Sequence, residues 1–307
     1  MPSNSNGEAT AIDETQVTAL ATQVGGHRTN EVKAQKGMKK WDRWVLKPLD
    51  EGERSARELA FYRRVFNGAG AGATDGADGA AIKEEEEWGD EWLKALRSLV
   101  PVFKGVVSVR RHMDGAVDTY IEMEDLCAGY ERPCVGDFKI GRHTYDDKAS
   151  MDKRKREESK YPWQAAVGFR ITGMRVYEPT SELDKEYDRF FGRGLDPEHV
   201  GAGIGAFLQG EVLSVPRRDV AAQVVADLDR LIAWFRRQRI YRFFSASILI
   251  VYDGGAQQPQ KPASATLIDF AHAYPISDGG GARGGGEIDD SSLFGLESLR
   301  KHFVALM

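Results

Sequence analysis

The stretch Pro133–Gly141 reads PCVGDFKIG and places two opposite charges inside a short β-strand, predicted over Gly136–Ile140. Alternate residues of a strand point to the same face, so Asp137 and Lys139 share one side of it. An acid beside a cation can orient a hydroxyl group and hold a transferring phosphoryl group. The same spacing also fits an exposed cross-strand ion pair, and spacing alone does not separate the two readings.

A highly charged helix is predicted to follow this strand, over Ala149–Lys160. Lys153, Arg156 and Lys160 recur at helical spacing and therefore share one face. Such a face can be a solvated surface, part of a nuclear-import signal or a site for an anion. Because it comes soon after the Asp/Lys strand, it fits a substrate that carries several phosphates.

Near the C-terminus, Leu267–His272 reads LIDFAH and places an aspartate at the end of an apolar strand. Asp269 in this position is typical of the metal-binding aspartate of kinase folds, and equally of an aspartate that caps a turn. His272 could contact an anionic substrate or be a structural histidine, and its immediate context favours the structural role.

Upstream, Lys47 lies in a strand predicted over Trp44–Leu49, and Glu58 lies in a helix predicted over Arg54–Phe66. Kinases pair a strand lysine with a glutamate on the next helix to hold the phosphates of ATP. Most Lys–Glu pairs at this separation are surface charges, so the spacing alone supports this function only weakly.

The charge of the 307-residue chain is unevenly distributed. Its formal net charge is −5, but six acidic residues lie within 84–91, and without them the net charge would be +1. An acidic balance disfavours a nucleic-acid partner, and no apolar run approaches the roughly 20 residues of a membrane span. The only cysteines are Cys127 and Cys134, which excludes a disulfide scaffold and fits a reducing compartment.

Two glycine-rich stretches hold 11 of the 33 glycines and cannot bury a core. We therefore predict a flexible insertion at 67–83, a flexible loop at 277–290 and a disordered N-terminus at 1–22. The order of the elements predicts an α+β protein with a small N-terminal lobe, 23–124, and a larger C-terminal lobe, 125–307. Further strands are predicted over 102–109, 119–123, 169–177, 243–252 and 265–270, and further helices over 84–99, 220–239 and 292–306.

Taken together, the motifs resemble the inositol polyphosphate kinase family, whose signature is P-x-x-x-D-x-K-x-G. PCVGDFKIG matches this signature, and GFRITGMRVY (Gly168–Tyr177), FFSASILIVYDG (Phe243–Gly254) and LIDFAH resemble later blocks in the same order. QVGGH (Gln23–His27) and the segment Val45–Tyr62 resemble the opening blocks. The short segment between the signature and GFRI is most similar to the multikinases of this family.

The resemblance implies a two-lobed fold like that of a protein kinase, with a short helical inositol-binding lobe over 142–167. It implies an enzyme that uses ATP and Mg²⁺ to phosphorylate inositol trisphosphate to the tetrakis- and pentakisphosphate. The alternatives are a hexakisphosphate kinase that makes pyrophosphates, and an inositol phosphate-binding scaffold without catalysis. A protein kinase is disfavoured because the chain lacks an H-R-D-x-x-x-x-N loop and a D-F-G motif. We expect a monomer of the nucleus or cytoplasm, with neither nucleic acid nor membrane as a partner.

The resemblance also implies roles for single residues. Asp137 and Lys139 would be catalytic, and Asp269 and Ser247 would hold the metal. The nucleotide would be bound by Lys47, Glu58, Glu124, Leu126, Asp137 and Asp269. The substrate phosphates would be bound by Arg54, Lys139, Arg156, Lys160 and His272.

One departure from the family concerns the substrate helix. Multikinases often carry glutamine where this chain has Arg156 and Glu157. Glu157 and Glu158 would repel a polyanion unless they point away, which leaves the preferred position of phosphorylation open.

Overall fold

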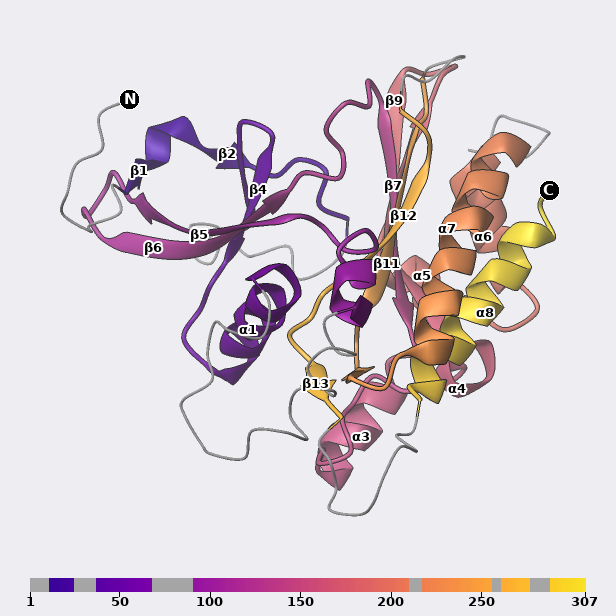
Figure 1. Ribbon diagram of the computed structural model, residues 1–307. Coiled ribbons are helices and arrows are strands. Elements are labelled where there is room, and N and C mark those ends of the chain that lie inside the picture. The colour runs from indigo at the N-terminus through magenta and orange to yellow at the C-terminus, as the bar shows by residue number, and fades with distance from the viewer. Residues whose placement is uncertain (1–10, 25–36, 68–90, 210–216, 256–260, 277–287) are drawn as a thin grey trace.

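A computed structural model describes residues 11–24, 37–67, 91–209, 217–255, 261–276 and 288–307 of the chain. Two β-sheets lie side by side, and the chain crosses from one to the other between β6 and β7 (Figure 1). Helix α1 lies below the first sheet, whereas α6, α7 and α8 cover one face of the second (Figure 1). This arrangement confirms the predicted α+β class.

The N-terminal sheet has six strands in the order β1-β5-β6-β4-β3-β2. Its strands pair antiparallel, except that β1 runs parallel to β5. Lys47 lies on β4, directly opposite Ile121 of the central strand β6. The strands are β1 (Ile12–Asp13), β2 (Thr18–Ala19), β3 (Lys39–Trp41), β4 (Trp44–Pro48), β5 (Phe103–Arg110) and β6 (Val117–Glu124).

The C-terminal sheet is antiparallel, in the order β12-β11-β7-β8-β9. The signature strand β7 is its central strand and is buried along most of its length, so its charged residues lie inside the protein. The strands are β7 (Pro133–Ile140), β8 (Phe169–Glu178), β9 (Leu183–Tyr187), β11 (Ser247–Asp253) and β12 (Ser264–Ile268), and a separate ribbon pairs β10 (Tyr241–Phe243) with β13 (Ala273–Pro275).

The helices bury the faces that their periodicity predicts. In α7, apolar residues from Val220 to Phe235 recur at helical spacing, and this stripe is buried against α8 and β12. The helices are α1 (Glu53–Asn67), α3 (Met151–Glu158), α4 (Gln164–Val167), α5 (Arg189–Arg193), α6 (Val200–Gln209), α7 (Arg218–Arg237) and α8 (Asp290–Val304), with a short 3₁₀ helix η1 (Glu14–Gln16).

An aromatic cluster joins α1 to the C-terminal part of the chain. Phe61 of α1 stacks on Phe270 with ring centroids 3.9 Å apart, and meets Tyr241 and Phe243 edge-on. Burying each such ring contributes about 1.5–3 kcal/mol. Helix α1 is therefore held against the segment that follows β12, which places Glu58 of this helix next to Asp269.

The helices α3 and α4 form a small lobe between β7 and β8. The Ser150 side chain caps α3 by accepting a hydrogen bond from the backbone N–H of Lys153. Gly168 ends α4 in the left-handed region, at φ +80°, where glycine is favoured. Gln164 of α4 donates through Nε2 to the carbonyl of Gly141 at 2.6 Å, which ties this lobe to the end of β7.

The predicted disorder of residues 1–22 is wrong for residues 11–22. Strand β1 pairs with β5, β2 pairs with β3, and the Glu14 carboxylate forms an ion pair with Lys39 at 3.0 Å. The N-terminal lobe therefore begins before residue 23. Because these two strands have two residues each and gain their order from distant partners, local composition did not reveal them.

Other predicted boundaries shift by a few residues. The predicted loop 277–290 overlaps α8, because Asp289 caps this helix and Asp290 begins it. The predicted strand 243–252 is broken at 244–246, where Ser245 has φ +59°. Residues 1–10, 68–83 of the insertion, 84–90 of the acidic run, 25–27 of QVGGH and 277–287 of the loop lie outside the described residues.

Alanine substitutions at two helical glycines should change the stability of the protein in opposite directions. A Cβ at Gly295 of α8 would meet the carbonyl oxygen of Gly168 and lie 2.6 Å from the Gly141 nitrogen, whereas a Cβ at Gly205 of α6 would meet nothing within 4 Å. Gly295→Ala should lower the free energy of unfolding by about 1–3 kcal/mol. Gly205→Ala should raise it by about 0.5–1 kcal/mol, because alanine loses less backbone entropy in a helix. Urea denaturation measures both, and wild-type stability of Gly295→Ala would contradict the close packing of α8.

Candidate active site

A three-residue charge cluster connects the two sheets through α1. The Nζ of Lys47, on β4, donates to Glu58 Oε1 and to Asp269 Oδ1, both at 2.8 Å. The Glu58 side chain is 5% exposed and that of Asp269, which follows β12, is 39% exposed. The Lys47–Glu58 pair expected from the sequence is therefore a largely buried contact, and it includes Asp269 as a third member.

Lys47 and Asp269 of this cluster both favour their charged forms. Burial opposes the charge on Lys47, but Asp269 and Glu58 outweigh it and raise the pKa of this lysine. Burial likewise opposes the charge on Asp269, but Lys47 and Lys139 outweigh it and lower the pKa of this aspartate. The site therefore keeps a lysine ammonium beside a partly exposed carboxylate at neutral pH.

Asp269 has a strained backbone. Its φ of +67° lies in the left-handed region, which costs a residue with a side chain about 1–2 kcal/mol. The next backbone N–H, of Phe270, donates to Glu58 Oε1 at 3.2 Å and so fixes the turn. Strain of this kind concentrates at functional positions and supports a binding role for Asp269 over a simple turn cap.

Asp137 and Lys139 lie at the centre of the C-terminal sheet. Asp137 is 6% exposed, and burial raises its pKa despite the opposing charge of Lys139. Burial also lowers the pKa of Lys139, whose Nζ donates to the carbonyl of Ser245 at 2.6 Å. Asp137 is thus buried and Lys139 partly buried, and no ion pair within 4 Å joins the two, so the alternative of an exposed ion pair between them does not hold.

Three oxygen-bearing side chains could meet a hard cation here. Asp137 Oδ1 and Ser247 Oγ are buried and have no hydrogen-bond partner among the described residues, and the Asp269 carboxylate is partly exposed. Mg²⁺ prefers such oxygen ligands and takes its remaining ligands from phosphates and water. No group of three or more His, Cys, Asp or Glu residues in the described part of the chain forms a metal cage. The donor set therefore fits a metal that binds together with phosphates.

The expected nucleotide hinge lies where the chain leaves the first sheet. The backbone N–H of Glu124 donates to the Val102 carbonyl at 2.9 Å, and the Val102 N–H donates to the Glu124 carboxylate at 3.3 Å. Leu126, two residues on, accepts a hydrogen bond from Lys261 Nζ at its carbonyl, at 3.3 Å. Both residues are thus fixed at the crossover between the sheets.

A group of cations surrounds His272, which follows Asp269 by three residues. Burial and then the charges of Arg54, Lys153 and Arg57 lower the pKa of His272 to about 4, against the opposing charge of Asp146. Arg54 is exposed at the start of α1, and Lys153 on α3 also pairs with Asp146 at 2.7 Å. The charges of Arg54 and of Lys153, from the predicted basic face, thus both act on His272.

The other two residues of the predicted basic face, Arg156 and Lys160, have different surroundings. Lys160 Nζ donates to Glu157 Oε1 at 2.6 Å, and Glu158 accepts a hydrogen bond from the Tyr145 hydroxyl at 2.7 Å. Arg156 is exposed, and no described residue forms a hydrogen bond or ion pair with its side chain, although the Ser159 hydroxyl donates to its backbone carbonyl at 3.0 Å. The two glutamates are therefore engaged by neighbours, and only Lys153 of this face contributes to the charge around His272.

Sequence reasoning missed Arg170 of β8. It is 6% exposed and lies directly opposite Lys139 in the β7–β8 pairing. The signal that could have revealed it is a single charged residue in the otherwise apolar start of GFRI, because a buried charge in a strand needs a specific partner.

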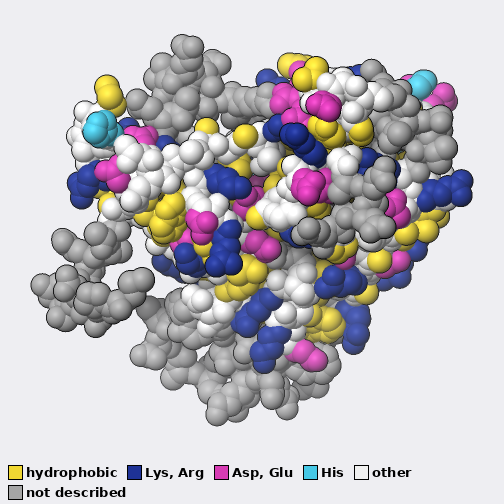
Figure 2. Space-filling view, turned by 90° about the horizontal axis from the view of Figure 1, so that it is seen from above, with side chains coloured by type: hydrophobic (Ala, Val, Ile, Leu, Met, Phe, Trp, Pro, Cys, Tyr) yellow, Lys and Arg dark blue, Asp and Glu magenta, His cyan; other side chains and the backbone are white. Residues whose placement is uncertain are grey.

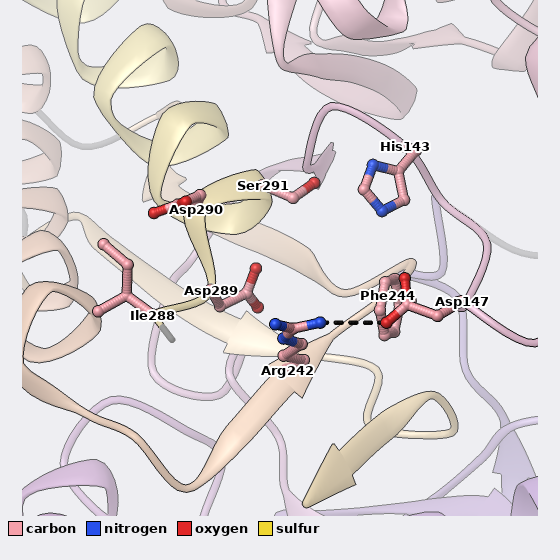
Figure 3. A pocket seen from close by; sticks show the side chains of 8 residues that line it. All are labelled: His143, Asp147, Arg242, Phe244, Ile288, Asp289, Asp290 and Ser291. Carbon is pink, nitrogen blue, oxygen red and sulfur yellow. Dashed lines mark hydrogen bonds and ion pairs between the residues drawn. The ribbon is translucent and has the colours of Figure 1, made fainter. Parts of the chain in front are cut away.

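The pocket drawn in Figure 3 is lined by none of the predicted site residues. Its volume is about 190 Å³, and Arg242 pairs with Asp147 across it at 3.1 Å (Figure 3). The Asp289 carboxylate accepts backbone hydrogen bonds from Phe243 and Ser292 there, so this acid caps α8 and its carboxylate is already hydrogen-bonded. Its lining residues are His143, Asp147, Arg242, Phe244, Ile288, Asp289, Asp290 and Ser291.

The outer surface carries charges of both signs. On the face shown in Figure 2, Lys and Arg side chains are interspersed with Asp and Glu. Among the described residues, none of the helices combines the length and the apolar character that crossing a membrane requires.

Several known proteins are similar in sequence to this chain. The profile of the inositol polyphosphate kinase family matches residues 120–304. The inositol polyphosphate multikinase of Mus musculus is 31% identical over 264 residues, which is 85% of this chain and 61% of the mouse protein. The multikinase of Oryza sativa subsp. indica is also 31% identical, over 91% of this chain and 90% of the rice protein. The chain thus spans about three fifths of the mouse relative's length and most of the rice relative's.

Solved structures share the fold. An inositol phosphate multikinase of S. cerevisiae, in complex with ADP and Mn²⁺, superposes with a TM-score of 0.61 at 21% identity, over 85% of this chain and 98% of the other. A second multikinase structure gives a TM-score of 0.55 at 26% identity, over 69% of this chain and 91% of the other. The ordered motifs, the two sheets joined at the Lys47 cluster and the matched family profile agree, and the chain belongs to the inositol polyphosphate kinase family.

Proposed function

We propose that the protein is a multikinase-type phosphotransferase that moves a phosphoryl group from ATP to a hydroxyl of inositol tris- and tetrakisphosphate. The observation that carries this proposal is the Lys47–Glu58–Asp269 cluster, which lies within electrostatic reach of Lys139 and of the cations around His272. The multikinase relatives match 78–91% of the chain, whereas a human inositol hexakisphosphate kinase matches 54% of it, which favours the multikinase activity.

The nucleotide would occupy the space between the two sheets. Lys47, held by Glu58, would contact its phosphates, and the backbone at Glu124 and Leu126 would meet the adenine. Asp269 and Ser247 would hold Mg²⁺, which neutralises phosphate charge when bound. All of these residues come from one chain, which supports a monomer as the active form.

The acceptor hydroxyl would be activated by Asp137. Its pKa is raised by burial, which strengthens it as a proton acceptor. As the hydroxyl oxygen bonds to the γ-phosphorus, the bond to the ADP oxygen breaks and the hydroxyl proton passes to the Asp137 carboxylate. Lys139 would stabilise the charge on the transferring phosphoryl group. Arg54, Arg156, Lys160 and His272 would contact the other phosphates, and Lys153, whose charge acts on His272, would join them.

Loss of either signature side chain should abolish most turnover. Asp137→Asn keeps the shape but removes the proton acceptor, and Lys139→Met removes the cation, so kcat should fall at least about 100-fold in each. The assay measures ATP consumption with inositol 1,4,5-trisphosphate, and NMR identifies the product.

Asp114→Asn is the matched control, because Asp114 pairs with Arg111 in the turn between β5 and β6. Its rate should equal that of the wild type. Unchanged rates in both signature variants would refute the assignment, and tight inositol phosphate binding without ATP turnover by the wild type would establish the scaffold alternative.

The low pKa of His272 predicts a pH effect on stability. The folded protein holds this pKa at about 4, below the ordinary value of 6.5, so the unfolded chain binds more protons between these values. The free energy of unfolding should therefore fall as the pH drops from 6.5 to 4, and His272→Gln should reduce this slope. Urea denaturation across this pH range measures it.

Burial is the largest cause of this shift, and a bound polyphosphate should offset the second cause, the charges of the neighbouring cations. Neutralising Arg54 and Lys153 should raise the pKa of His272, which histidine NMR detects on adding inositol 1,4,5-trisphosphate without ATP. Unphosphorylated inositol is the control and should leave the resonance in place. If the His272 resonance did not shift on addition of the trisphosphate, this histidine would not belong to the substrate site.

A further inference from the structure

We propose that Arg170 binds a phosphate of the inositol polyphosphate beside Lys139, and that Glu157 is the internal carboxylate that this phosphate replaces. The proposal rests on the proposed function and deepens it, because it names a specificity-determining contact that the predicted site does not include.

Arg170 and Lys139 are cross-strand neighbours. They lie directly opposite each other in the antiparallel pairing of β7 and β8, so their side chains leave the same face of the sheet. Like charges in this position repel, and Arg170 is almost completely buried. Two adjacent cations at the centre of a sheet therefore call for an anion between or beside them.

The described residues supply no carboxylate bonded to either cation. Arg170 Nη1 donates to Gln164 Oε1 at 3.0 Å, and Lys139 Nζ donates to the Ser245 carbonyl at 2.6 Å. No ion pair within 4 Å joins Arg170 or Lys139 to an acidic side chain in the described part of the chain. Buried charges with only neutral partners are unfavourable, and an incoming phosphate would compensate them.

Glu157 is the acidic residue that most offsets the charge of Arg170 in the free protein. Burial lowers the pKa of Arg170, and the Glu157 charge is the largest effect that opposes it, while Arg193 of α5 adds a further cation nearby. Yet Glu157 bonds to Lys160 at 2.6 Å and to the Thr144 hydroxyl at 3.4 Å, not to Arg170. Glu157 is thus bonded to Lys160 and offsets the charge of Arg170 only from a distance, as Asp137 does too.

A phosphate group fits this cluster better than a carboxylate. It carries a charge of about −1.5 to −2 at neutral pH, and the planar guanidinium of arginine can bind two of its oxygens at once. To reach Arg170 and Lys160 it must compete with Glu157, so the affinity reflects the difference between the two anions. This explains how a glutamate can occupy a polyanion site without excluding the substrate.

Calorimetry with inositol 1,4,5-trisphosphate in the absence of ATP tests the contact. Arg170→Met should weaken binding about tenfold or more, and Arg170→Lys should recover part of the loss. Glu157→Gln should strengthen binding about threefold, because the competing charge is gone. The matched control is Arg142→Met, since Arg142 is exposed, stacks 3.6 Å from the Phe294 ring centroid and should leave the affinity unchanged.

Steady-state kinetics and a double variant separate binding from a structural role. Arg170→Met should raise KM for the inositol phosphate and leave KM for ATP unchanged, and in the Arg170→Met background the benefit of Glu157→Gln should largely disappear. Equal changes in both KM values, or a trisphosphate affinity of Arg170→Met equal to that of the wild type, would overturn the proposal while leaving the proposed function intact. A wild-type protein that neither binds nor phosphorylates the trisphosphate would overturn both.

Discussion

The ion pairs of Lys47 with Glu58 and Asp269 connect the parts of this protein that must act together. Lys47 belongs to the N-terminal sheet, Glu58 to α1, and Asp269 to the segment that leaves the C-terminal sheet. Removing one partner would leave a largely buried charge, an effect of about 3–5 kcal/mol in such pairs. The stacked rings of Phe61 and Phe270 hold α1 in place, and the same contact keeps Asp269 in its strained conformation. Packing and charge thus support one geometry.

Local periodicity was sufficient to predict the elements that form this frame. The signature strand β7, helix α1 and the amphipathic helix α7 follow from their sequence patterns, whereas spacing alone supported the pairing of Lys47 with Glu58 only weakly and the family resemblance implied it. The remaining elements depend on distant contacts. Strand β9 is largely exposed and has no clean alternation, and α6 contains three glycines that disfavour a helix until its apolar face is buried. The break at Ser245 arises because its carbonyl meets Lys139 and its hydroxyl meets Thr144.

The candidate site was predictable in its residue types more than in its contacts. The spacing predicted that Lys153, Arg156 and Lys160 share one face. In the structure only Lys153 of the three acts on His272, because neighbouring carboxylates and the packing of α3 determine where each charged group lies. The contact of Arg170 could not be predicted, because the strand register that places it opposite Lys139 cannot be read from the sequence. The net charge of −5 likewise describes the whole chain and not the site, where cations predominate.

A site for a polyanion that contains its own carboxylates has a physical logic. Lys47, Lys153 and Lys160 each pair with an acid, namely Asp269, Asp146 and Glu157. Without these acids, several cations within one small volume would repel each other and destabilise the folded protein in the absence of substrate. With them, each lysine is held in a fixed position, which reduces the entropy lost when a phosphate arrives. Under the proposed function, the affinity for a polyphosphate would depend on how readily phosphate replaces a carboxylate such as Glu157, so the acids of the site would contribute to its selectivity as much as its bases.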